Sequence, residues 1–405
     1  MLQPEYFNDK ADVLIEYYRD LENWILQDIA ERLLASDNTS ATVDREIWKL
    51  EQMGLHKHEI LKRLSSLTKK STNEIRKQLQ NAVLTSYNDE KEIYATQGIE
   101  LVNPLENAVI RSVMDAEWRK VGNELYNLTM TSIDQSGMDL IRLLNQAEIK
   151  VSSGIISYSQ AINDVIDEYA KTGLIINYPS GTRRSLESAV RCCVVTSMNQ
   201  TAAQVSNAYI NEHNIEYVLV SAHLGARHDK KNPTGLSSHD YWQGKAYKIK
   251  GQEKGYPNLF QSTGYDITDE GKGIVRNPLG LHGYNCRHSH QGWFKDLKNP
   301  YVNEDGSPKI AEEESQRLYE LQQEQRAKER AIRQTKRRIL AKELEINQVA
   351  ETDVKSILNN DFIKLKQRLK EQNKKYTDFC TNNNLVRQSD RLKVAGYKAG
   401  TKDRF

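Results

Sequence analysis

Hydrophobic residues recur at three- and four-residue steps through residues 12–35, which is the spacing of an amphipathic helix. These positions are Leu14, Tyr17, Leu21, Trp24, Ile25, Ile29 and Leu33. Shorter helices are predicted over 44–53, with Gly54 as the stop, over 58–67, and from Ser71, whose hydroxyl can cap a helix. The same spacing continues to about residue 147. The N-terminal part is therefore predicted to be a bundle of short helices followed by longer ones.

The spacing changes near the middle of the chain. A helix is predicted over 157–170 with Gly173 at its end, and a long helix over 184–211 carries Cys192 and Cys193. Residues 216–223 instead form the β-branched run Glu-Tyr-Val-Leu-Val-Ser-Ala-His, which predicts a strand. Ten glycines between positions 225 and 283 interrupt any long element beyond it. We expect a small, loop-rich α+β unit there.

Helical spacing returns after the linker Asn-Glu-Asp-Gly-Ser-Pro and runs from about residue 310 to about 350. One seven-residue spacing holds Leu318, Gln325, Ile332, Ile339 and Ile346. The companion positions are mostly polar: Leu321, Lys328, Thr335, Lys342 and Val349. Such a half-apolar, coiled-coil-like seam predicts packing on a partner or a neighbouring helix rather than a strict dimer. A last amphipathic helix carries Phe362, Leu365 and Leu369, and the tail over 387–405 is basic.

Together these patterns predict a mainly α fold with a small loop-rich α+β unit in its centre and helical arms at both ends. The predicted domains are an N-terminal helical bundle over 1–90, a long-helix region over 91–215, the His/Cys-rich unit over 216–300 and coiled-coil-like helices with a basic tail over 301–405. Only 38% of residues are hydrophobic and 28% are charged, with a mean hydropathy of -0.71. That composition favours elongated helices with large solvated faces.

The overall charge excludes a global attraction to nucleic acid or membranes, because 57 basic residues balance 55 acidic ones. Four cysteines, two of them adjacent, do not make the framework of a secreted disulfide protein, so a reducing compartment is expected. The sequence has neither a basic-then-apolar leader nor a run of about 18 uncharged apolar residues. We therefore expect a protein kept in the cytoplasm unless a larger assembly carries it out.

Candidate chemistry is concentrated in the central unit, which holds six of the nine histidines. Cys286 and His288 are two residues apart, and other side chains of the unit could complete a tetrahedral shell of sulfur and imidazole around one zinc ion. The candidate ligands are His223, His239, His282, Cys286 and His288, with His228 and His290 also within the unit. Zinc modules usually show two close ligand pairs, and only Cys286/His288 qualifies. The alternative, which the single pair favours, is that these side chains are hydrogen-bonded structural contacts.

Two catalytic interpretations use the same residues. Arg287 and His288 could lower the pKa of Cys286 and make it a nucleophile, although adjacency in sequence does not place a base in front of the thiol. Alternatively, a nuclease would use His223 or His239 as acid and base, with Arg227 or Arg287 holding phosphate. Such groupings often occur without catalysis, so the sequence favours a protein that is not an enzyme.

A basic run on the C-terminal helix gives a third candidate function. Its members are Arg326, Lys328, Arg330, Arg333, Lys336, Arg337 and Arg338. Contact with packaged DNA is one interpretation. The favoured alternative is a solvated helix face, because Glu320, Glu324 and Glu329 lie among or just before the basic residues and no aromatic side chains interleave to stack on bases.

Three sequence blocks occur in order in the central unit: Ser221-Ala-His-Leu-Gly-Ala-Arg227, His239-Asp-Tyr-Trp-Gln-Gly-Lys245 and Gly280-Leu-His-Gly-Tyr-Asn-Cys-Arg-His-Ser289. They resemble the signature blocks of the phage minor capsid protein 2 family of tailed phages and prophages of Gram-positive bacteria. Further similar stretches lie at 178–181, 184–203, 319–326, 336–338 and 387–391. Members of that family tend to carry cysteine where this chain has His282. Because cysteine and histidine exchange readily as zinc ligands, this difference favours a metal site that includes His282, Cys286 and His288.

The resemblance implies a structural virion protein encoded near the portal gene and related in role to the head-morphogenesis proteins of Mu-type phages. We therefore expect a minor capsid protein that acts at or near the portal vertex in head assembly and in DNA packaging or ejection. Its implied partners are the portal protein and the major capsid protein, with no membrane, and its implied location is the virion, assembled in the cytoplasm of the bacterial host. A capsid-carried, metal-dependent nuclease or hydrolase and a DNA-binding scaffold are the alternatives.

Overall fold

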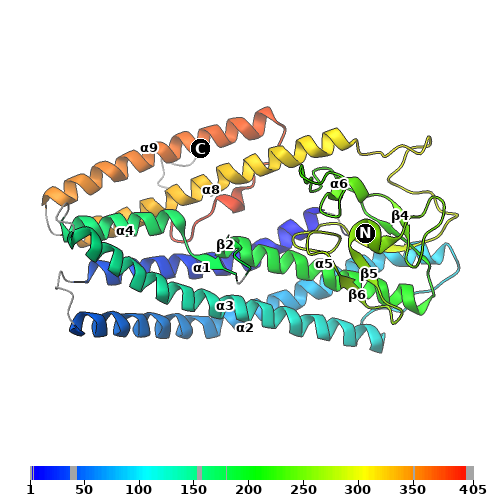
Figure 1. Ribbon diagram of the computed structural model, residues 1–405, viewed down its shortest axis with the longest axis horizontal. Helices are drawn as coiled ribbons and strands as arrows, with labels where there is room; N and C mark the ends of the chain where they lie inside the picture. Colours follow the sequence, from blue (N-terminus) through cyan, green and yellow to red (C-terminus); the bar gives the residue numbers. More distant parts are fainter. Residues whose placement is uncertain are drawn as a thin grey trace. The chain divides into compact units, whose positions relative to one another are not determined.

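The computed structural model describes residues 2, 4–36, 43–152, 157–178, 180–349 and 352–397. Its long helices are α1 (Pro4–Leu34), α2 (Val43–Ala95), α3 (Ala108–Ser152), α5 (Leu186–Glu212), α8 (Glu312–Gln348) and α9 (Thr352–Asn382). The short ones are α4 (Tyr158–Thr172), α6 (His239–Trp242), α7 (Leu259–Thr263) and the 3₁₀ turn η1 (Ser389–Leu392). The strands are β1 (Ile175–Asn177), β2 (Arg183–Ser185), β3 (Tyr217–Val220), β4 (Ala246–Lys248), β5 (Tyr265–Ile267), β6 (Gly273–Val275) and β7 (His290–Trp293). The mainly α fold is confirmed, and five of these strands lie in the predicted α+β unit (Figure 1).

The chain divides into two compact units, each built from separate stretches of sequence. Unit 1 comprises residues 1–14, 70–125 and 190–323, and unit 2 comprises 15–69, 126–189 and 324–405. The helices α1, α2, α3, α5 and α8 each contribute residues to both units.

Helix α2 corrects the prediction of three short N-terminal helices. It runs without a break from Val43 to Ala95 and passes through Gly54, where a stop was predicted. A glycine inside a helix costs only about 1 kcal/mol relative to alanine. Good helix formers on both sides of Gly54, such as Lys49 and Leu55, outweigh that cost.

Helices α4 and α5 were predicted more accurately. The side chain of Ser157 caps α4 by accepting a hydrogen bond from the backbone N–H of Gln160, and Gly173 ends the helix with a positive φ. Helix α5 carries Cys192 and Cys193 as predicted, although Arg184 belongs to β2 rather than to the helix.

The core of unit 1 surrounds a three-stranded antiparallel sheet in the order β4-β3-β7. Strand β3 is buried along its whole length, which explains its unbroken apolar sequence, and Val220 pairs with His290 of β7. Trp242 of α6 and Tyr247 of β4 pack with Val218 in this core. The loops that precede and follow the central strand are thereby fixed on a rigid base.

In unit 2, the seam of α8 packs on α9 of the same chain. Ile332 and Ile339, which share the predicted seven-residue spacing, are fully buried with Leu365, Leu369 and other residues of α9. Gln325 occupies the same seam, where its side-chain N–H group donates to the Val386 carbonyl at 2.8 Å. The neighbouring helix anticipated from the half-apolar seam is therefore α9 (Figure 1).

Candidate metal centre

Three segments of unit 1 bring histidine and cysteine side chains together beside the central sheet. The loop after β3 supplies His223, the first turn of α6 supplies His239, and the loop before β7 supplies Cys286 and His288. The loops flanking β3 and β7 are tied together, because the Ser221 N–H group donates to the Ser289 carbonyl at 2.9 Å. The sheet therefore sets the distance between residues more than 60 positions apart in sequence.

Among the described residues, His239, Cys286 and His288 form one group whose possible ligand atoms all lie within 4.8 Å of one another. All three side chains are buried. Cys286 Sγ lies 3.8 Å from His288 Nδ1. A sulfur and two imidazoles at this spacing are donors that zinc prefers, and the cluster can hold a metal.

The hydrogen bonds of the two buried imidazoles determine which ring nitrogens face the cluster. His239 Nε2 donates to the Leu279 carbonyl at 2.7 Å, and His288 Nε2 donates to the side-chain oxygen of Gln243 at 3.0 Å. A neutral imidazole carries only one N–H, so Nδ1 of each ring keeps its lone pair. Metal-binding histidines are held in the same way, with the second nitrogen donating to an oxygen.

His223 stacks on the same cluster. Its ring centroid lies 4.3 Å from that of His288, with 24° between the ring planes. The Nδ1–H group donates to the Leu224 carbonyl at 3.0 Å. His223 Nε2 is buried and has no hydrogen-bond partner among the described residues, and His223 lies outside the group of His239, Cys286 and His288.

His282 belongs to a different group of buried side chains. Its Nδ1 lies 2.9 Å from the Asn199 side-chain oxygen, and its Nε2 lies 2.7 Å from Nδ1 of His290. His290 Nε2 in turn lies 2.9 Å from the side-chain oxygen of Asn207. Both nitrogens of each ring are therefore engaged, and the structure does not bring His282 into the group of His239, Cys286 and His288.

Burial determines the protonation of these groups. It lowers the pKa of His223 to about 4 and that of His290 to about 3, and it holds the pKa of His239 and His288 well below the usual range. The imidazoles are therefore neutral at pH 7, which is the form that binds metal.

Cys286 does not have the properties of an activated nucleophile. Burial raises the pKa of its thiol, an effect that outweighs the nearby charges of Arg227 and Arg287. The sequence argument for a lowered pKa considered the adjacent arginine and missed the burial. A buried thiol of this kind ionises when a metal replaces its proton.

Two other residues singled out in the sequence have structural partners. His228 Nδ1 lies 2.8 Å from a carboxylate oxygen of Asp240, away from the cluster. The guanidinium group of Arg227 donates to the carbonyls of Leu279 and Tyr284 and so fixes the loop that holds the His239 side chain.

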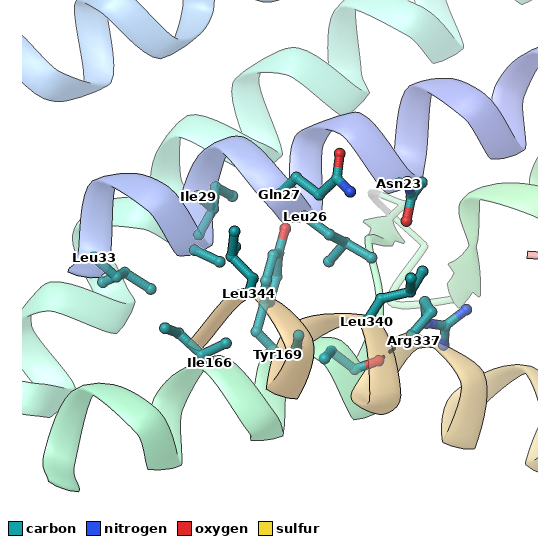
Figure 2. Close-up of a pocket in the computed structure, with 13 residues that line it drawn as sticks. Asn23, Leu26, Gln27, Ile29, Leu33, Ile166, Tyr169, Arg337, Leu340 and Leu344 are labelled. Carbon is teal, nitrogen blue, oxygen red and sulfur yellow. Dashed lines mark hydrogen bonds between the residues drawn. The ribbon is translucent and has the colours of Figure 1, made fainter. Parts of the chain in front are cut away.

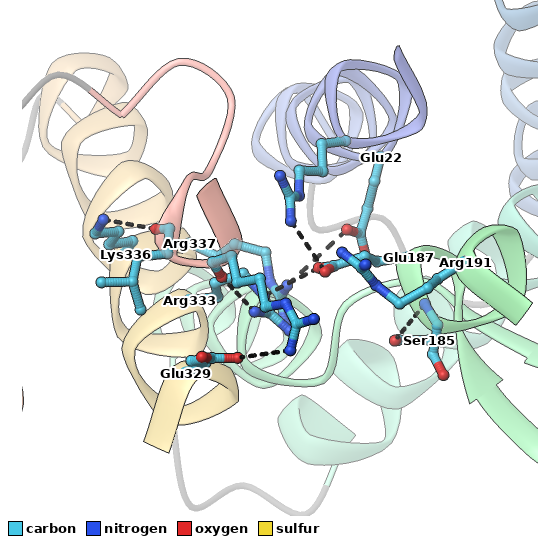
Figure 3. A network of polar contacts seen from close by, with 12 residues as sticks. Glu22, Ser185, Glu187, Arg191, Glu329, Arg333, Lys336 and Arg337 are labelled. Carbon is cyan, nitrogen blue, oxygen red and sulfur yellow. Dashed lines mark hydrogen bonds and ion pairs between the residues drawn. The ribbon is translucent and has the colours of Figure 1, made fainter. Parts of the chain in front are cut away.

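Much of the basic run lies inside unit 2 and has partners there. Arg333 Nε lies 3.1 Å from a carboxylate oxygen of Glu187, and Arg338 Nε lies 2.7 Å from Asp167. Lys336 and Arg337 donate to the carbonyls of Leu392 and Ala170. Figure 3 shows Arg333 and Arg337 of α8 in one polar network with Glu187 and Glu22. The basic face of α8, which was predicted to be solvated, therefore contacts other residues of unit 2 over much of its length.

A small cavity in unit 2 offers no comparable chemistry. It measures about 20 Å³, room for one or two water molecules, and is lined mainly by Leu26, Leu33, Ile166, Leu340 and Leu344 (Figure 2). Asn23, Gln27, Tyr169 and Arg337 are the polar residues among the described residues that line it. The cavity is far smaller than the several hundred Å³ (roughly 300 or more) of a typical ligand site.

Sequence reasoning missed the side chains that surround the cluster. Gln243 accepts from both the His223 backbone N–H group and the His288 ring, each at 3.0 Å. Asn199 and Asn207, on α5, hold the second histidine pair from about 83 positions away in sequence. No spacing rule predicts contacts over such separations.

Comparison with known proteins places this architecture among structural proteins of phage virions. A family model described as Phage minor capsid protein 2 matches residues 2–381. The chain is also similar to a structural protein of Lactococcus phage LL-H, with 24% identity over 303 residues that cover 72% of this chain and 76% of that protein. The chain belongs to the phage minor capsid protein 2 family, which confirms the resemblance seen in its sequence blocks. No solved structure matches it.

None of the described helices is both long enough and apolar enough to span a membrane.

Proposed function

We propose that this minor capsid protein acts at the portal vertex, where it contacts the portal protein and the major capsid protein during head assembly and DNA packaging or ejection. The observation that carries the proposal is the family match over residues 2–381, which covers nearly the whole chain and assigns it to the phage minor capsid proteins. Assembly would take place in the host cytoplasm and end in the virion. The role is structural, and it requires no turnover by the chain itself.

Co-expression tests the portal assignment directly. The full chain is produced with the portal and major capsid proteins, and particles are separated by sedimentation. We expect the chain in portal-containing particles and its loss from particles made without the portal protein. Equal incorporation in the absence of the portal would contradict the vertex role, and a cryo-EM map of the whole virion would then show where the protein resides.

We further propose that His239, Cys286 and His288 hold one zinc ion as a structural link in unit 1. Two neutral imidazoles with lone pairs facing a buried thiol support this choice over hydrogen-bonded contacts alone. Elemental analysis of untagged protein should find close to one zinc per chain. Protein that is folded and contains no zinc after purification with added zinc would contradict the assignment.

A DNA-binding role for the basic helix receives less support. Arg333, Lys336, Arg337 and Arg338 have partners within unit 2, as described above, and guanidinium groups that pair with carboxylates are poorly available to phosphates. A nuclease or hydrolase receives less support as well, because His239 is buried with its Nε2 bonded to the Leu279 carbonyl, and the Nδ1–H group of His223 is bonded to the Leu224 carbonyl.

A further inference from the structure

Near the candidate metal centre, His223 Nε2 is a buried polar atom that has no hydrogen-bond partner in the described part of the chain. Nε2 of this residue carries a lone pair, since the ring's N–H is at Nδ1 and donates to the Leu224 carbonyl. An unsatisfied buried acceptor lowers the stability of the folded state, so such an atom calls for a partner. The His223 ring stacks on the ring of His288, which is one of the three members of the candidate metal-binding group.

We propose that His223 Nε2 is the fourth ligand of a closed zinc site, completing a shell with His239 Nδ1, Cys286 Sγ and His288 Nδ1. This inference rests on the proposed zinc site and specifies its coordination. One sulfur and three nitrogens form a tetrahedral set that suits Zn²⁺. On binding, the Cys286 S–H bond breaks, a Zn–S bond forms, and the thiol proton leaves to solvent. The imidazoles bind without losing a proton because they are already neutral.

The surroundings of the three imidazoles support this assignment. Each ring donates its single N–H group to an oxygen: the Leu224 carbonyl for His223, the Leu279 carbonyl for His239 and the Gln243 side chain for His288. Oxygen acceptors of this kind orient metal-binding histidines and make their free nitrogens better donors. Gln243 also accepts from the His223 backbone, so one amide aligns two of the ligands.

His282 is the rival for the fourth position, because the family's cysteine is expected there. Turning its ring toward the metal would break the 2.9 Å contact with Asn199 and the 2.7 Å contact with His290. Both lost contacts are fully buried, so the change would leave polar atoms unpaired. His223 also lies outside the group of three, and coordination would shift its stack on His288, but it would break no hydrogen bond of Nε2 to any described residue.

Closure by a fourth protein ligand decides the chemistry of the site. Catalytic zinc sites keep one position open for water or substrate, whereas structural sites fill all four with protein ligands. A shell that includes His223 therefore links the loop after β3, the start of α6 and the loop before β7. The metal fixes these segments on the sheet and activates no water.

Cobalt substitution of the full-length protein tests the number of ligands. Co²⁺ is titrated into metal-free, untagged protein, and visible absorption is recorded for the wild type, His223→Ala, His223→Cys and the control His282→Gln. We expect the intense bands of a tetrahedral centre in the wild type and in His282→Gln. His223→Ala should lose that intensity as water enters and should bind zinc at least tenfold more weakly. His223→Cys should restore the tetrahedral bands with stronger sulfur-to-cobalt absorption.

The outcomes distinguish the role of His223 from the zinc site on which that role depends. A wild type that binds neither cobalt nor zinc refutes the zinc site itself, and the fourth ligand falls with it. Metal binding that His223→Ala and His223→Cys leave spectroscopically unchanged refutes only the role of His223. Loss of the tetrahedral bands in His282→Gln, with retention in His223→Ala, assigns the fourth position to His282 instead.

Discussion

Unit 1 and unit 2 each bury a polar centre, but the His/Cys centre of unit 1 is neutral at pH 7, whereas the centre around Glu187 in unit 2 consists of charged groups. In unit 2, Glu187 lies 3.0 Å from Arg19 and 3.1 Å from Arg333, and all three side chains are at most 12% exposed. In unit 1, the polar centre consists of imidazoles whose pKa values burial has lowered, together with a protonated thiol.

The difference shows which partner the buried polar groups of each centre require. In unit 2, the carboxylate of Glu187 pairs with the guanidinium groups of both Arg19 and Arg333, so these opposite charges meet within the unit (Figure 3). In unit 1, a bound metal ion would supply the cation for the lone pairs at His223, His239 and His288. Unit 2 should therefore respond to loss of a charge, and unit 1 to loss of a metal.

Removal of Glu187 should produce the largest effect. Glu187→Ala leaves the buried charges of Arg19 and Arg333 without their carboxylate, which should lower the free energy of unfolding by about 3 to 5 kcal/mol. Urea denaturation measures this loss in the free energy of unfolding. The control is Glu168→Ala, which removes an exposed ion pair with Lys171 and should cost no more than about 1 kcal/mol. Equal losses in the two variants would show that the buried network adds nothing.

Removal of zinc should have the second-largest effect on stability, and it should destabilise unit 1. A ligand that binds only the folded state at one hundred times its Kd stabilises that state by about 2.7 kcal/mol. Chelation of the metal should lower the thermal midpoint of the wild type and leave that of Cys286→Ser unaffected. An identical midpoint for the wild type with and without chelator argues for hydrogen-bonded contacts instead. A Cys286→Ser particle that assembles normally and fails only in cleaving nucleic acid would favour an enzyme.

Substitution of Glu90 tests whether a buried charge elsewhere in unit 1 also lowers its stability. This carboxyl group is fully buried, and burial raises its pKa to about 7 although Ser86 and Ser206 donate to it. A raised pKa in the folded state means that stability is lost as pH rises from the unfolded value near 4.5 toward 7. Glu90→Gln should therefore stabilise the protein at pH 8 by on the order of 2 kcal/mol and have little effect at pH 4. Matching unfolding curves for the two proteins at pH 8 would contradict this.

The smallest effect should come from the rim of the unit 2 network. Arg338 binds both carboxylate oxygens of Asp167, at 2.7 and 2.9 Å, but both side chains are 23% exposed. Arg338→Gln should cost about 1 kcal/mol, and exposed Arg330→Gln less than about 0.5 kcal/mol. DNA binding measured by filter retention should be the same for both variants. A larger loss of DNA affinity in Arg338→Gln would return the basic run to the DNA-binding interpretation.

The helices were the most predictable part of the fold, because periodic spacing is a local property. Ser157 and Gly173 located both ends of α4, and the β-branched run located β3. The error at Gly54 arose from treating a modest local cost as a stop signal.

The partners of the functional side chains were not predictable, because they lie far away in sequence. The six central histidines looked like one cluster, and only the positions of Asn199 and Asn207 on α5 separate His282 and His290 from the others. The basic run similarly looked exposed until Glu187 and Asp167, more than 140 residues earlier, were found beside it. Periodicity identifies the buried face of a helix but not the residues that meet it.

The hydrogen bonds that run through His282 and His290 can be ordered from donor to acceptor. If Asn199 and Asn207 both present oxygens to the rings, four ring nitrogens need three protons, which would bury a positive charge. Turning the Asn207 amide removes that charge, because the Tyr265 hydroxyl, 2.7 Å away, donates as readily as it accepts. Every hydrogen bond then points the same way, from Tyr265 through both imidazoles to Asn199, whose N–H group donates to the Cys286 carbonyl at 2.7 Å. The aligned dipoles reinforce one another and end on the peptide group of the residue that supplies sulfur to the proposed metal centre.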